Sequence, residues 1–80
     1  MTERQRARAR AVQARLKAKR EEVGMGLEEL ARAADVNRRT LDKYFQGDSA
    51  SPSFFLVVSI AGALGVSLVE LAEIDGAGGA

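Results

Sequence analysis

Glycine residues divide this chain of 80 residues into short segments that each have the composition or spacing of a helix. Gly24 and Gly26 bracket a short connection, and Gly47 and Gly65 each follow a stretch with apolar residues at helical spacing. Glycine is favoured just after a helix because the terminating residue often adopts a left-handed conformation that other residues resist. This arrangement of glycines predicts an all-α fold with short connections.

The helix signals predict one domain over residues 6–74. Asn37, Ser51 and Ser67 are suitable N-caps, and Pro52 suits the first position of a helix. Residues 1–5 are expected to form a flexible basic arm and residues 75–80 a flexible tail, because neither segment has an apolar anchor. The five predicted helices cover about residues 6–23, 27–34, 37–46, 52–64 and 67–73.

The chain has no cysteine and no histidine. Disulfides, zinc sites with thiolate or imidazole ligands, and the usual general base near neutral pH are therefore excluded. No pair of titratable residues has a spacing that favours acid–base or nucleophilic chemistry, and the glycines form no phosphate-binding loop. We therefore expect no enzyme activity, no cofactor and no metal. A chain without disulfides also fits a reducing cytoplasm.

Charge is distributed unevenly along the sequence. Residues 1–20 hold eight basic residues and one acidic residue, whereas residues 48–80 hold four acidic residues and no basic one. Such asymmetry is typical of a cationic end that meets a polyanion, although a solvated, frayed terminus would have the same composition. The first interpretation makes the basic start of the chain a phosphate-binding segment, through Arg4, Arg6, Arg8 and Arg10.

The stretch from Leu27 to Gln46 combines two short helices with a three-residue turn. Helices joined in this way must cross steeply, and Ala31 is small enough for the close approach. Leu30, Ala34, Val36, Leu41 and Tyr44 are expected in the shared core. The opposite face of the second helix carries Arg38, Arg39, Asp42, Lys43 and Gln46. A helix with one apolar face and one polar, cationic face fits a major groove about 12 Å wide.

In this region the chain resembles the lambda-repressor-like family, also called the Cro or xenobiotic-response-element type of helix-turn-helix. The family pattern of leucines, an E-E-L-A segment, a turn, a loop with proline and a closing L-G-V-S segment is met in register. The matching residues are Leu16, Arg20, Gly24, Met25, 28–31, 36–38, Thr40, Leu41, Gly47, Pro52, 64–68 and Leu71.

The resemblance implies a five-helix DNA-binding domain, usually dimeric, that binds a palindromic operator and regulates transcription. It assigns base reading to Arg38, Arg39 and Lys43. Asp42 is expected to orient Arg38, with acceptance of a bond from a cytosine amino group as the alternative. Contacts with phosphates are expected for Asn37, Thr40 and Gln46.

The chain departs from the family pattern at three places. Leu27 replaces a glutamine that often contacts DNA, and Asp35 replaces the glycine of the turn. Phe45 stands where the family often has an acidic residue that pairs with the arginine of the first helix. Arg20 is therefore expected to lack that partner.

The uncharged stretch of residues 49–69 is interrupted by serine, proline and glycine, so it does not resemble a membrane span. Phe54 is expected in the core. Other apolar residues stand where the family usually has polar ones, which predicts either a dimer interface or a wider core. These residues are Phe55, Leu56, Val58 and Val69.

The sequence thus predicts a sequence-specific binder of double-stranded DNA, acting as a transcriptional repressor in a bacterial or phage setting. The alternative is a protein-interaction module, such as an antitoxin or anti-repressor component, that holds a partner through the fourth and fifth helices. An interaction module would have no reason to keep Arg38, Arg39 and Lys43 exposed together.

Overall fold

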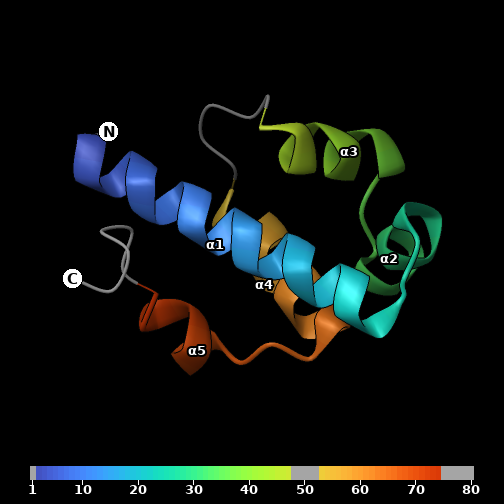
Figure 1. Cartoon of the computed structure of the whole chain (residues 1–80). Helices are drawn as coiled ribbons and strands as arrows, with labels where there is room; N and C mark the ends of the chain where they lie inside the picture. Colours follow the sequence, from blue (N-terminus) through green and yellow to red (C-terminus); the bar gives the residue numbers. More distant parts are fainter. Residues whose placement is uncertain (1, 48–52, 75–80) are drawn as a thin grey trace.

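The computed structural model describes residues 2–47 and 53–74, and within them the secondary structure is entirely helical (Figure 1). The prediction of an all-α fold with five helices is confirmed. In chain order the helices are α1 (Glu3–Val23), α2 (Leu27–Ala34), α3 (Arg38–Gln46), α4 (Phe54–Leu64) and α5 (Leu68–Ala72).

Left-handed residues end the first four helices, as the sequence predicts. Gly24, Gly47 and Gly65 have φ values of 71°, 80° and 76°. Asp35 ends α2 with a φ of 56°, and it is the one described residue other than glycine with a positive φ. A short polar side chain makes this conformation tolerable, and the turn between α2 and α3 depends on it.

The first helix begins earlier than the predicted start near residue 6. Thr2 caps α1: its hydroxyl accepts from the Gln5 amide at 3.1 Å, and the Gln5 side chain accepts from the Thr2 amide at 2.8 Å. This reciprocal cap satisfies two backbone donors without any apolar anchor. Residues 3–5 of the expected flexible arm are therefore helical, and α1 is one rod of 21 residues.

The fourth helix begins at Phe54, two residues later than predicted. Ser53 supplies the cap, because its hydroxyl accepts from the Leu56 amide at 3.1 Å. A serine cap needs only a free hydroxyl and an extended backbone, so Ser51 and Ser53 are equivalent in the sequence. Pro52 and Ser51, like the expected tail at 75–80, lie outside the described residues.

The core draws on every helix. Leu16 of α1, Leu30 of α2, Leu41 of α3 and Ile60 of α4 are fully buried, and Leu71 of α5 joins them. Burying a side chain of this size contributes roughly 1.5–3 kcal/mol. The expected contributions of Ala34 and Tyr44 are confirmed, and Val12 and Val36 are partly buried at the edge of the core.

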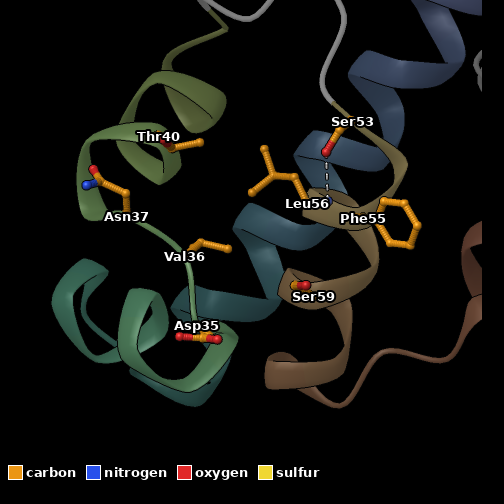
Figure 2. Close-up of a pocket in the computed structure, with 8 residues that line it drawn as sticks. All are labelled: Asp35, Val36, Asn37, Thr40, Ser53, Phe55, Leu56 and Ser59. Atoms are coloured by element: carbon orange, nitrogen blue, oxygen red, sulfur yellow. Dashed lines mark hydrogen bonds between the residues drawn. The ribbon is translucent and has the colours of Figure 1, made fainter.

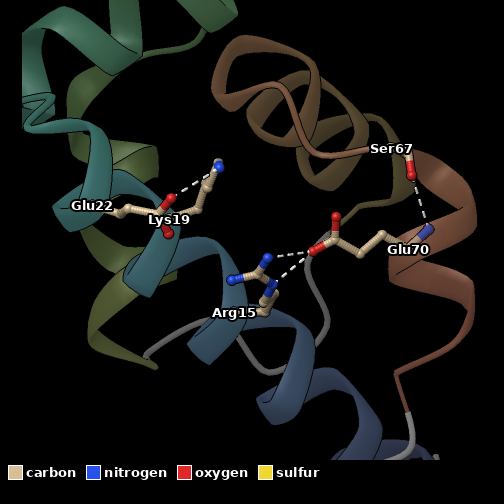
Figure 3. A network of polar contacts seen from close by, with 5 residues as sticks. All are labelled: Arg15, Lys19, Glu22, Ser67 and Glu70. Atoms are coloured by element: carbon tan, nitrogen blue, oxygen red, sulfur yellow. Dashed lines mark hydrogen bonds and ion pairs between the residues drawn. The ribbon is translucent and has the colours of Figure 1, made fainter.

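Polar contacts attach α5 to α1 (Figure 3). Both Nε and Nη2 of Arg15 lie within 2.7 Å of Glu70 Oε2. Nearer the start of α1, Arg8 Nη2 donates to the Ala72 carbonyl at 2.8 Å. These contacts hold the short fifth helix against α1 while Leu71 enters the core.

Burial decreases along α4 toward its first residue. Ile60 and Ala61 are fully buried and Val57 is partly buried, but Phe54 is 71% exposed. The prediction that Phe54 belongs to the core is wrong: Phe54 has the helical register of Ala61, but in the first turn of α4 it is Leu56 and Val57 that pack against the core. Within residues 2–47 and 53–74 no helix combines the length and apolarity that a membrane crossing would need.

Candidate nucleic-acid interface

The turn between α2 and α3 is set by the backbone and by one small residue. The Val36 amide donates to the Ala31 carbonyl at 2.9 Å and closes the end of α2 across Asp35. Ala31 itself is buried where the two helices approach. Asn37 then starts α3, because its side-chain oxygen accepts from the Arg39 amide at 2.8 Å. These local contacts fix the orientation of α3.

The third helix has the two faces that the sequence predicts. Leu41 and Tyr44 are buried against the body of the protein. Burial raises the pKa of Tyr44 to about 12, so its phenol is neutral at physiological pH. The opposite face presents exposed polar side chains, with Asp42 partly buried beside them; the exposed ones are Arg38, Arg39, Thr40, Lys43 and Gln46.

The predicted contact between Asp42 and Arg38 is corrected. Asp42 accepts from Gln46 Nε2 at 3.0 Å and so does not orient Arg38. Arg38 instead reaches back to the first turn of α2, where its Nη1 lies 3.1 Å from Glu28 Oε1. The two side chains are 60% and 71% exposed, and such a pair contributes at most about 1 kcal/mol. Arg38 can therefore exchange Glu28 for another anion at little cost.

Arg39 and Lys43 differ from Arg38. Both are exposed, and within the part of the chain that the structure describes neither takes part in an ion pair. One helical turn separates them, so they lie on the same face of α3. Asn37 and Thr40 are exposed at the start of the same helix.

The structure separates the four arginines at the start of α1, which the sequence treats as one group. Arg8 Nη2 donates to the Ala72 carbonyl of α5, and its contact with a phosphate stays a prediction. Arg10 lies 3.7 Å from Glu3 in a well-exposed pair. Arg4 and Arg6 are exposed on the helix surface.

Sequence reasoning missed the partner of Arg20. Its guanidinium carbon lies 5.6 Å from the centre of the Phe45 ring, and its Nη1 donates to the Met25 carbonyl at 3.0 Å. A cation above an aromatic face is stabilised by the ring quadrupole. Phe45 therefore replaces the acidic partner of the family pattern. Gln13 Nε2 also donates to the Tyr44 carbonyl, and together these contacts fix the end of α3 on α1.

A shallow open pocket of about 390 Å³ lies between the start of α3 and the start of α4 (Figure 2). Asn37 and Thr40 form one wall, and Phe55 and Leu56 form the other. Phe55 is 79% exposed. Of the other residues predicted for a dimer interface, Val69 is exposed on α5, whereas Leu56 and Val58 are partly buried.

Two short helices that meet at a buried alanine, with exposed cations on the outer face of the second, define a helix-turn-helix DNA-binding protein. The model of the helix-turn-helix family matches residues 16–71. The chain belongs to this family, in its lambda-repressor-like type, whose domain binds DNA and has no enzymatic role. No curated protein and no solved structure matches the chain.

Proposed function

We propose that this protein is a sequence-specific transcriptional repressor that reads the major groove with α3. The observation that carries the proposal is the exposure of Arg39 and Lys43 on one face, in the described structure without an acidic partner. An arginine fork can donate two hydrogen bonds to guanine, and a lysine can reach the same acceptors. Arg38 joins them once a base or phosphate replaces Glu28.

Phosphate contacts then come from the ends of α3. Asn37 uses its side-chain oxygen for the helix cap, so its amide group is left to donate to a phosphate. Thr40 and Gln46 have exposed donors toward the two ends of the same helix. Such contacts fix the register of a protein on the duplex, whereas the base contacts supply the specificity.

Assembly as a homodimer on a palindromic operator is part of this proposal. One helix of this length reads few base pairs, and two copies on half-sites about 34 Å apart would give useful specificity. The rings of Phe54 and Phe55 form an exposed edge-to-face pair with centres 5.9 Å apart. We place the two-fold contact at this end of α4 and at Val69, with Leu56 and Val58 supporting it from a partly buried position.

The selection of bound fragments from random double-stranded DNA tests the function. We expect enrichment of one motif with two inverted half-sites. Enrichment of a single half-site would contradict binding to a palindrome but would still support base reading by α3. Recovery of random fragments, or no recovery, would contradict sequence-specific binding.

The exposed apolar residues also favour a second candidate, a module that holds a protein partner through α4 and α5. Phe54, Phe55, Leu68 and Val69 are all more than half exposed. An interaction module of this kind would retain partner binding after the cations of α3 were removed. The random-DNA selection separates the two candidates, because the interaction module would enrich no motif.

A further inference from the structure

The first helix has two basic faces that point to different neighbours. Arg8 and Arg15 lie on the face next to α5, where they contact Ala72 and Glu70. Gln13 lies on another face, which contacts the end of α3 through the Tyr44 carbonyl. A basic stripe shares the face of Gln13, because residues separated by three, four or seven positions lie above one another on a helix. The basic stripe consists of Arg6, Arg10 and Lys17.

The core shows which way this stripe faces. Val12 and Leu16 lie on one side of Gln13, and both pack into the interior. Arg10 and Lys17 lie on the other side of Gln13, and both are exposed. On α3, Phe45 lies beside α1 under Arg20, and the polar face of α3 begins next to Phe45 with Asp42. The basic stripe therefore adjoins the polar face of α3 and extends that surface past the end of the helix.

We propose that the basic stripe binds the phosphates of the DNA strand that flanks the groove occupied by α3. The proposal rests on the proposed DNA-binding function and adds a second contact, made by a rigid helix instead of a flexible arm. Arg6 and Lys17 are about 16 Å apart along the axis at 1.5 Å per residue, and phosphates of one strand recur about every 3.4 Å of duplex axis. The basic stripe is therefore long enough to contact more than one phosphate.

The ion pair that Arg10 makes within the chain is weak. Arg10 and Glu3 lie 3.7 Å apart with side chains 64% and 81% exposed, so a phosphate can replace the carboxylate. The contacts of Gln13 and Arg20 with α3 keep α1 from moving when it binds. The ordering of a flexible arm would cost conformational entropy that a helix already formed does not lose.

The test compares two double variants with equal loss of charge. R10Q with K17Q removes two cations from the basic stripe, and R4Q with R32Q removes two exposed cations outside it, one from the opposite side of α1 and one from α2. Glutamine is a good helix former, so both variants should stay folded, which circular dichroism checks. The dissociation constant is measured against salt for the selected motif and for random DNA.

Each lost phosphate contact changes the slope of log affinity against log salt by about 0.9. We expect the stripe variant to flatten the slope by about 1.8 on both DNAs, and the control variant by less than half as much. Equal flattening in the two variants would overturn the proposal in favour of a general charge effect. An unchanged slope with motif selectivity intact would overturn the proposal alone. Failure of the wild type to bind DNA would overturn both proposals.

Discussion

The two walls of the pocket in Figure 2 both carry exposed side chains but differ in chemistry. The α3 wall, with Asn37 and Thr40, continues into the exposed cations Arg39 and Lys43. The α4 wall carries Phe55, which is 79% exposed. Exposed charges are stable in water, whereas an exposed phenylalanine gains roughly 1.5–3 kcal/mol when it is buried. The first wall suits a polyanion and the second suits a protein surface.

The largest expected effect is a loss of stability at high pH, caused by Tyr44 on the buried side of α3. Tyr44 has a pKa of about 12 in the folded protein, compared with 10.0 for a tyrosine in water. The protonated phenol of Tyr44 therefore stabilises the folded state fully below pH 10. This stabilisation is lost as the pH rises toward 12, because the tyrosine of the unfolded chain loses its proton at a lower pH. We expect the free energy of unfolding to fall by roughly 1–3 kcal/mol over this range. Chemical denaturation at a series of pH values measures it.

The control for this titration is Y44F, which keeps the ring and removes the phenol. The loss of unfolding free energy between pH 10 and 12 should become smaller in the variant. Tyr44 is the single tyrosine of the chain, so its tyrosinate absorbance reports its pKa directly. A native pKa near 10 would show that the phenol is not buried.

Removal of the aromatic ring from the α4 wall tests whether this wall is an interface. F55E should leave the stability of the monomer within about 0.5 kcal/mol, because the side chain is exposed. The dimer should lose the roughly 1.5–3 kcal/mol that burial of each ring supplies. Sedimentation in the presence of the selected DNA measures the assembly. V23E, which places a carboxylate on an exposed valine at the far end of α1, is the control. Unfolding of F55E would place Phe55 in the core.

The contact between Arg20 and Phe45 should have a smaller effect. A double-mutant cycle with R20A and F45L isolates the coupling, which we expect at about 0.5–2 kcal/mol of unfolding free energy. R32A, on the exposed side of α2, gives the effect of arginine loss without an aromatic contact. Coupling near zero would mean that the guanidinium and the ring are neighbours without mutual stabilisation.

Local patterns predicted the α2–α3 unit well and its surroundings less well. The turn at Asp35, the cap at Asn37 and the buried Leu41 all follow from residues close together in the sequence. Phe54 has the right register for the core, but its burial depends on how far neighbouring helices extend. The helix start at Glu3 follows from Thr2 and Gln5, a signal that is readable in the sequence once a glutamine is accepted at the third position.

The long-range contacts of the arginines were beyond local patterns. Arg8 meets Ala72, and Arg38 meets Glu28 instead of Asp42, because extended side chains select partners across helices. The resemblance to the family indicated where Arg20 should find a partner but gave the wrong chemistry for this chain. A cation above Phe45 needs no acidic residue, so the pattern of charges could not reveal it.

Base reading by α3 is tested by the loss of selectivity for the motif in R39A. We expect affinity for the selected motif to fall about 5- to 150-fold, equivalent to about 1–3 kcal/mol, while affinity for random DNA falls much less. R32A removes the same charge from α2 and should lower the affinity for the motif and for random DNA slightly and equally. An equal loss on the motif and on random DNA in R39A would contradict base reading by α3.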